Sequence, residues 1–131
     1  MPLHQRICTF GFPLLDEIMG GIEVGDLVIL QGATGTGKSA FGRHLLNHWR
    51  QTGMAAYVVD TQQHSSTTAM MLDALAAGVS PRDHLHEALN DAQMASVQAR
   101  RLAQDLPAVE IRSDGAGAVA ELERRAATGA V

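Results

Sequence analysis

The sequence predicts an α/β fold in which a mostly parallel sheet carries helices on both faces. Two observations lead to this prediction. Short, continuous apolar runs, typical of strands buried on both faces, alternate with segments whose apolar residues recur at helical spacing. Glycine, proline and serine residues stand between these segments, where helices start and stop. The chain of 131 residues is long enough for one core, and we therefore expect a single domain over residues 1–131.

The first predicted elements surround a glycine-rich loop. Residues 12–19 form an amphipathic helix that ends at Gly20-Gly21, and a turn leads into the apolar run 27–30, which we predict to be a buried strand. After the loop, apolar residues at helical spacing predict a helix over residues 41–49, and Gly53 closes it. This order places the loop between the carboxyl end of a strand and the start of a helix.

The later elements repeat the alternation of strand and helix. Residues 55–60 are predicted as a second buried strand. Ser65 or Ser66 can cap a helix that runs to Gly78, and Ser80-Pro81 marks the start of another helix. The remaining predictions are a helix over residues 94–106 stopped by Pro107, a short strand over residues 108–112 and an amphipathic helix over residues 118–127.

The composition limits the classes of function. With 46% hydrophobic and 18% charged residues, the chain is globular rather than disordered. The formal net charge of −4 argues against a surface that binds DNA unaided, because such a surface needs net positive charge. The single cysteine, Cys8, excludes a disulfide within the chain, and no apolar run has the length of a membrane span or a signal-peptide core. We therefore expect a cytoplasmic protein that does not bind a membrane.

The glycine-rich loop carries the chemistry. It fits the pattern G-x-x-x-x-G-K-[ST] at every fixed position, with the residues Gly32, Ala33, Thr34, Gly35, Thr36, Gly37, Lys38 and Ser39. Glycines let the backbone curl so that several main-chain N–H groups meet one phosphate, and the start of the following helix adds its own free N–H groups. We therefore assign phosphate binding to the stretch from Gly32 to Ala40. Lys38 would neutralise the β- and γ-phosphates, and the Ser39 hydroxyl would bind Mg²⁺.

The segment before the loop carries a family resemblance. The stretch "FGFPLLDEIMGGIEVGDLVILQGATGTGKSAF" matches a T-G-F-x-x-L-D-x-x-x-G-G-x-x-x-G-D lead-in, in which Phe10 interrupts the usual Thr-Gly pair. The matching positions are Gly11, Leu15, Asp16, Gly20, Gly21, Gly25 and Asp26. Lead-in and loop together resemble the ATPase domain of DnaB-type replicative helicases and the wider RecA-like group, which includes the RadA and KaiC proteins. The later stretches "MMLDALAAGVS", "VEIRSD" and "VAELERRA" follow in an order similar to that of the helicases, which favours the helicase branch.

The resemblance implies a RecA-like P-loop NTPase that binds ATP and Mg²⁺ as part of a DnaB-like DNA helicase. Such a protein assembles with copies of itself, as a hexameric ring in the family, and couples ATP hydrolysis to movement on single-stranded DNA during replication. The family's DNA-facing loops come after the segments present in this sequence. The resemblance therefore assigns no DNA contact to a residue of this chain.

Two departures from the family bear on hydrolysis. The glutamate that activates the attacking water in this group is matched here by Gln62, which can orient a water but cannot take its proton. The family's next strand, which ends in the Mg²⁺-binding Walker B aspartate, does not occur in the sequence. We therefore expect the front half of a RecA-like domain that lacks full hydrolysis on its own, with Lys38 and Gln62 as its candidate catalytic residues.

Two alternative functions stay open. The first is a nucleotide-binding module without catalysis, a truncated or degenerate relative, which Gln62 and the missing Walker B acid favour. The second is a small nucleotide kinase, in which Asp60 at the end of the apolar run 57–59 would face Ser39 and bind Mg²⁺. A kinase also needs an arginine-rich lid over its phosphates, whereas the arginines of this sequence are scattered over predicted helix faces.

Two further expectations concern packing. A half-domain leaves the strand beside the predicted 27–30 strand unpaired and exposes a sheet edge and apolar helix faces. We therefore expect the isolated chain to associate with itself or to fold poorly. His44 and His48 lie four residues apart on the helix after the loop, as metal ligands can. Because no third ligand stands nearby in the sequence, we interpret them as surface histidines.

Overall fold

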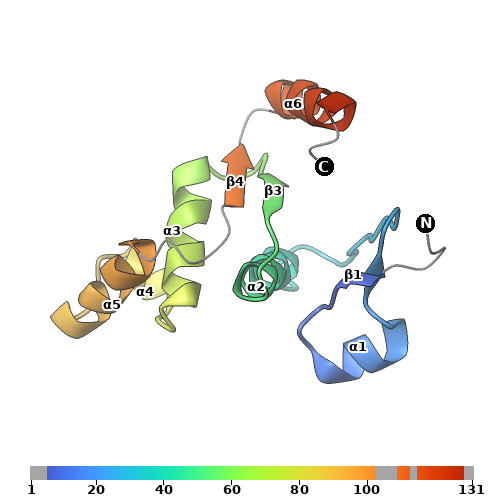
Figure 1. Ribbon diagram of the computed structural model, residues 1–131. Helices are drawn as coiled ribbons and strands as arrows, with labels where there is room; N and C mark the ends of the chain where they lie inside the picture. Colours follow the sequence, from blue (N-terminus) through green and yellow to red (C-terminus); the bar gives the residue numbers. More distant parts are fainter. Residues whose placement is uncertain (1–5, 103–108, 113–114, 129–131) are drawn as a thin grey trace.

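The computed structural model describes residues 6–102, 109–112 and 115–128 (Figure 1). Helices predominate over strands in these ranges. In chain order the elements are β1 (Arg6–Cys8), α1 (Pro13–Met19), β2 (Ile22–Glu23), α2 (Lys38–Gln51), β3 (Ala56–Val59), α3 (Ser65–Ala76), α4 (Pro81–Leu85), α5 (Asp91–Leu102), β4 (Val109–Arg112) and α6 (Gly115–Thr128).

The strands form two separate pairs. β1 and β2 are antiparallel, with Arg6 opposite Glu23 and Cys8 opposite Ile22. β3 and β4 are parallel over their whole length, from Ala56 opposite Val109 onward. The helices α3, α4 and α5 connect β3 to β4, since parallel neighbours require a long crossover between them. The sequence predicted β3 and β4, whereas the short pair β1–β2 was not foreseen.

The run 27–30 is not a strand, contrary to the prediction. Leu27 is 84% exposed and Ile29 77%, and among the described residues the backbone of this run makes no hydrogen bond. A strand forms only where a neighbouring strand completes the ladder of hydrogen bonds. No described strand lies beside residues 27–30, and an apolar run whose composition favours a strand is therefore left irregular.

The helix boundaries follow from local capping. Pro13 lies in the first turn of α1, and Gly20 ends that helix in the left-handed conformation while its N–H donates to the carbonyl of Asp16. Ser80 caps α4 by accepting the N–H of Asp83, as predicted. α3 differs from the prediction, because its cap is His64, whose ring accepts the N–H of Ser66. An imidazole nitrogen can replace the hydroxyl because it is also an acceptor.

The core of the described residues is small and centres on α3. Its most deeply buried side chains include Leu72 and Ala74 of α3, Val97 of α5 and, outside this centre, Phe10. Figure 1 shows α4 and α5 lying against α3, with α2 between this group and the β1–α1–β2 segment. Within the described ranges, no helix combines the length and the apolar character that crossing a membrane would require.

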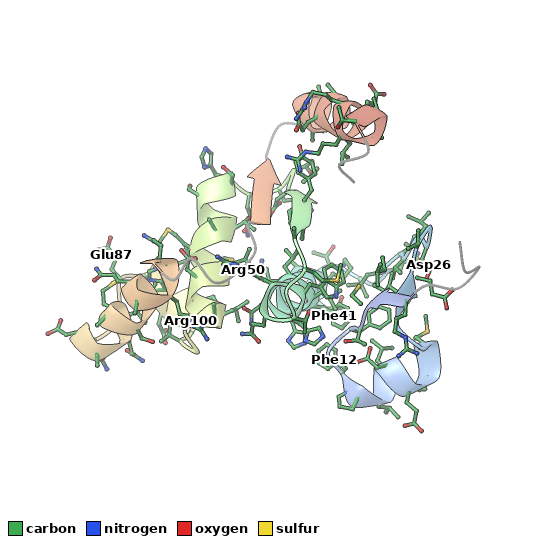
Figure 2. All side chains as sticks on the ribbon, viewed as in Figure 1. Phe12, Asp26, Phe41, Arg50, Glu87 and Arg100 are labelled. Carbon is green, nitrogen blue, oxygen red and sulfur yellow. The ribbon has the colours of Figure 1, made fainter. Side chains whose placement is uncertain are left out.

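The lead-in to the glycine-rich loop packs on α2 through aromatic and histidine side chains. His48 forms a hydrogen bond of 2.9 Å with the Thr9 hydroxyl, and the Trp49 indole donates to the Thr9 carbonyl at 2.7 Å. Phe12 stacks on Phe41 and lies against the ring of His44, with centroid distances of 5.4 and 4.3 Å (Figure 2). The two histidines are therefore half-buried packing residues rather than the surface residues we expected.

Candidate functional site

The glycine-rich loop curls back on itself before α2 begins. The Thr36 hydroxyl donates to the carbonyl of Ala33 at 2.7 Å. Gly35 and Gly37 adopt φ values of 82° and 92°, which side-chain-bearing residues rarely reach. A Cβ atom on Gly32 would lie 2.9 Å from the Thr36 hydroxyl oxygen. Gly35 and Gly37 are therefore favoured for their backbone geometry, whereas a side chain on Gly32 would require the Thr36 hydroxyl to move.

The first turn of α2 presents unpaired main-chain donors. Gly37 precedes the helix without a side-chain cap, and the first intrahelical bond runs from the N–H of Phe41 to the carbonyl of Gly37. The N–H groups of Lys38, Ser39 and Ala40 consequently have no acceptor among the described residues. Free N–H groups at the positive end of a helix dipole are suited to an anion.

Lys38 is held over the loop by two carbonyls. Its ammonium donates to the carbonyl oxygens of Gly32 and Ala33, each at 2.7 Å. An ammonium has three donors, and two are used here. The third N–H and the positive charge remain for an anion, and the side chain is already fixed at the mouth of the loop. This geometry fits the phosphate-binding role predicted for Lys38.

A pocket of about 450 Å³ opens beside the loop and brings most of the predicted residues together. Lys38 and Ser39 line it together with Gln62, which comes from the segment after β3. The lining residues are Thr34, Gly35, Gly37, Lys38, Ser39, Ala40, Arg43 and Gln62. Gly32, Ala33 and Thr36 are not among the lining residues, and their contacts are the hydrogen bonds within the loop and to Lys38. Gln62 therefore lines the same pocket as Lys38 and Ser39.

Asp60 is placed differently. One of its oxygens accepts the N–H groups of Gln62 and Gln63 at 3.0 and 3.1 Å, and the other accepts the Thr68 hydroxyl at 2.8 Å. Partial burial raises the pKa of Asp60, but these hydrogen bonds and the positive charge of Arg43 outweigh it, so the pKa is lowered overall. Asp60 therefore stays ionised and ties β3 to α3, and it is not among the residues that line the pocket.

The acidic residues form no evident metal centre. Within the described ranges, no cluster of three or more histidine, cysteine, aspartate or glutamate side chains could hold a metal ion. None of the residues that line the pocket carries a carboxylate. A Mg²⁺ ion that arrives with a nucleotide could use the hydroxyl of Ser39, which lines the pocket.

The sequence analysis missed Arg43. Its guanidinium belongs to the same pocket as Lys38 and Gln62, and it is close enough to Asp60 to lower the pKa of that carboxyl. The loop pattern leaves this position free, so the motif gives no signal for it. The signal that could have been used is spacing, because Arg43 follows Ser39 by four residues and shares its helix face.

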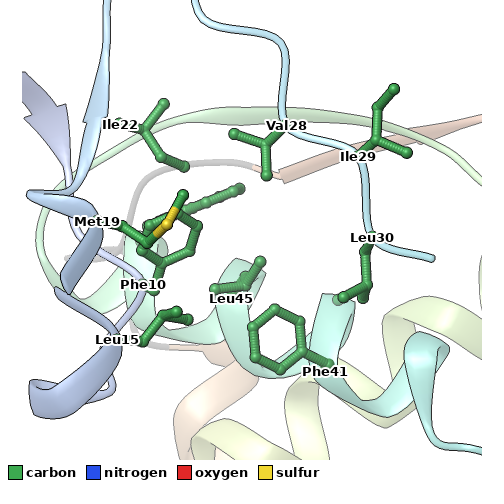
Figure 3. A pocket seen from close by; sticks show the side chains of 11 residues that line it. Phe10, Leu15, Met19, Ile22, Val28, Ile29, Leu30, Phe41 and Leu45 are labelled. Carbon is green, nitrogen blue, oxygen red and sulfur yellow. The ribbon is translucent and has the colours of Figure 1, made fainter. Parts of the chain in front are cut away.

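A second, apolar pocket of about 310 Å³ lies between α1, the run 27–30 and α2 (Figure 3). Phe41 and Leu45 of α2 face Val28 and Leu30 across it in that view. The pocket is the incompletely filled space beneath the irregular run. It contains no charged side chain and is therefore not a second anion site.

The chain is similar in sequence to a DNA repair protein. The DNA repair protein RadA of Mycobacterium tuberculosis, in strains CDC 1551 / Oshkosh and ATCC 25618 / H37Rv, is 29% identical to this chain over 76 residues. The match covers 57% of this chain and spans only 16% of the length of RadA. No family model matches the sequence, and no solved structure matches it. RadA belongs to the RecA-like group that the lead-in and the loop resemble.

Proposed function

We propose that this chain is a RecA-like nucleotide-binding domain that holds the phosphates of ATP, with Mg²⁺, in the pocket beside the glycine-rich loop. The observation that carries the proposal is the placement of Lys38. Its ammonium is fixed by two loop carbonyls and lines the same pocket as Ser39 and the free N–H groups of the first turn of α2. The similarity to RadA over 76 residues supports the same group.

The residues of the pocket favour binding over hydrolysis. Gln62 lines the pocket where the family has a glutamate, and an amide can orient a water but cannot accept its proton. Asp60 uses both of its carboxylate oxygens to hold the β3–α3 loop. This engagement argues against the kinase alternative, in which Asp60 would bind Mg²⁺ opposite Ser39. A binding module with little turnover of its own is the reading that the contacts support best.

The finer proposal is a role in ATP-dependent DNA metabolism. The order of the later segments favours the DnaB-type helicase branch, whereas the sequence similarity is to a DNA repair protein, RadA. In the helicase branch the ATP site would act within a ring of copies on single-stranded DNA. The helicase branch is tested by a strand-separation assay on the complete protein assembled on DNA. ATP-dependent separation of a DNA duplex would support this branch, because it is the activity of a helicase.

The proposal is tested by titrating the chain with fluorescently labelled ATP in the presence of Mg²⁺. We expect saturable binding, and we expect Lys38→Ala to weaken it at least about tenfold, since a hydrogen-bonded charge is worth more than the roughly 1.4 kcal/mol of a tenfold change. Arg82→Ala is the matched control, because Arg82 is exposed on α4 and outside the pocket. Phosphate release measured in the same samples reports any turnover.

Chemical modification of Lys38 gives a second test of nucleotide binding. Lys38 is the only lysine of the chain, so an amine-directed reagent modifies one side chain. ATP should protect Lys38 from the reagent and leave the N-terminal amine reactive, as followed by mass spectrometry of the peptide that contains it. Modification of Lys38 at an unchanged rate in saturating ATP, together with equal binding by Lys38→Ala, would refute the proposed function.

A further inference from the structure

Arg43 brings a second cation to the pocket beside the glycine-rich loop. It lies on α2, four residues after Ser39, and residues at this spacing share one face of a helix. Both line the pocket, with Gln62 contributed by the loop after β3. Lys38 is anchored to the carbonyls of Gly32 and Ala33, at the loop end of the pocket. The two cations therefore border the pocket at different points along α2.

The guanidinium of Arg43 is available for a ligand. Among the described residues, no hydrogen bond or ion pair of Arg43 is found, and its one interaction is the charge attraction that lowers the pKa of Asp60. Asp60 does not need Arg43 for its hydrogen bonding, because Gln62, Gln63 and Thr68 already donate to its oxygens. A half-buried guanidinium with its donors unused, in a pocket without carboxylates, is suited to a phosphate.

The position of Arg43 indicates which phosphate it would meet. In this type of loop the main-chain N–H groups hold the inner phosphates, and the hydroxyl at the position of Ser39 stands on the side of the metal and the outer phosphate. Arg43 lies one helical turn after Ser39, and it lines the same pocket as Ser39 and Gln62. A cation on the side of Ser39 and Gln62 would therefore stand nearer to the outermost phosphate of a triphosphate than to the inner phosphates that the main-chain N–H groups hold.

We propose that Arg43 is the residue by which this pocket distinguishes a nucleoside triphosphate from a diphosphate. The planar guanidinium donates to oxygens of the outermost phosphate and makes no contact with a diphosphate. This inference rests on the proposed function, since it requires that the loop of Gly32 to Ser39 hold a nucleotide. It gives the outermost phosphate a second cation besides Lys38, and this cation, unlike Lys38, has no hydrogen-bond partner among the described residues.

The test compares two ligands in matched variants of the full chain. The ligands are ADP and the non-hydrolysable β,γ-imido analogue of ATP, and their dissociation constants are measured by calorimetric titration with Mg²⁺. We expect the wild type to prefer the triphosphate analogue. Arg43→Gln should weaken binding of the analogue at least about tenfold, or about 1.4 kcal/mol, and leave ADP binding unchanged within error. Arg43→Lys keeps the positive charge but loses the planar guanidinium with its paired N–H donors, so it should retain part of the preference for the triphosphate analogue.

Controls separate this inference from the proposed function. Arg82→Gln removes the same charge outside the pocket and should change neither constant. Circular dichroism melting establishes that Arg43→Gln is folded. If the wild type binds neither ligand, the proposed function fails. If the wild type binds both ligands but Arg43→Gln weakens both equally, or neither, nucleotide binding stands and the role of Arg43 in specificity is refuted.

Discussion

The carboxylate of Asp60 holds together the loop that leads from β3 to α3. It accepts the N–H groups of Gln62 and Gln63 and the hydroxyl of Thr68, a buried residue of α3. Because Gln62 lines the pocket beside the glycine-rich loop, Asp60 positions one wall of that pocket without lining it. At the scale of single residues, an aspartate that follows an apolar run can thus stabilise a loop through hydrogen bonds instead of binding a metal ion.

The lowered pKa of Asp60 predicts a pH-dependent contribution to stability. The carboxylate form is favoured in the folded chain, so this contribution is complete above the ordinary aspartate pKa of 3.8 and is lost as the pH falls through the lower folded-state value. Asp60→Asn should therefore lower the free energy of unfolding by about 1 kcal/mol near pH 7, the scale of a hydrogen bond near solvent. The difference from wild type should shrink below a pH of about 3.8.

Urea unfolding at a series of pH values measures this difference. Glu17→Gln, an exposed change on α1 that also removes one negative charge, serves as the control and should show no such trend. Hydrogen bonds from Arg124 and Arg125 lower the pKa of Glu121 to about 2, but Glu121 is present in both proteins and cancels from the comparison. A destabilisation by Asp60→Asn that persists unchanged at the lowest pH would mean that the charge of Asp60 is not involved.

Some residues of the candidate site could be predicted from the sequence and others could not, for a physical reason. Gly37 and Lys38 could be predicted because both stand at fixed positions of the loop pattern; the structure gives Gly37 a φ of 92° and places the ammonium beside two loop carbonyls. Arg43 could not, because its role depends on which side of α2 faces the segment after β3. The hydrogen bonds of Asp60 depend on where Thr68 comes to lie, eight residues along the chain.

At the scale of the elements, the lead-in is fastened to α2 by side chains from both sides. Asp16 of α1 accepts the N–H groups of Phe10 and Gly11, and His48 of α2 bonds the hydroxyl of Thr9. Gly11 lies flat against the His48 ring, where an added Cβ would come within 2.7 Å of a ring carbon. This explains why the lead-in pattern has glycine and aspartate at these positions, since both fix the approach of the segment to α2.

Gly11→Ala should therefore cost more stability than a glycine substitution that strains only the backbone. Gly20 provides the matched control, because its φ of 77° is close to the 79° of Gly11 and nothing lies within 4 Å of its added Cβ. Gly20→Ala should cost about 1–2 kcal/mol from left-handed strain alone. Gly11→Ala should cost about 1–3 kcal/mol more, the scale of overpacking, as measured by chemical denaturation. Equal losses in the two variants would show that the lead-in does not pack on His48 in solution.

The elements themselves were predictable where local signals decide them. Helices α1 and α4 begin at Pro13 and Pro81, and these boundaries lie in the sequence. β1 and β2 were not predicted, because strands of three and two residues are too short to show a period. The run 27–30 is the opposite case, since its apolar composition is that of a strand but strand formation depends on a partner elsewhere in space.

At the scale of the whole molecule, the described residues leave much apolar surface uncovered. Leu14, Ile18 and Leu27 are each at least 70% exposed, and the core of the described residues, which centres on α3, is small. The α/β fold class with a mostly parallel sheet stays a prediction. The parallel pair β3–β4 agrees with it but is only two strands of such a sheet. The sequence could not show which of the predicted strands pair with each other. Strand pairing depends on contacts between distant parts of the chain, and a local sequence pattern does not contain them.

The apolar run 27–30 predicts self-association of the isolated chain. Its unpaired backbone is free to pair with an edge of another copy, and Leu27 and Ile29 would bury their side chains in the contact. We expect the mean mass from light scattering to rise with protein concentration. Changing both Leu27 and Ile29 to lysine should raise the dissociation constant of the assembly at least about tenfold, because burying each such side chain is worth about 1.5–3 kcal/mol.

Val119→Lys tests whether the effect belongs to this run or to exposed apolar residues in general. Val119 is 57% exposed on α6, away from residues 27–30, and its replacement by lysine adds charge in the same way. It should leave the association unchanged. Association that both replacements weaken equally would point to nonspecific adhesion. A wild-type chain that stays monomeric at every concentration and melts cooperatively would show that residues 27–30 are covered within the molecule, and that the open run seen here is not its state in solution.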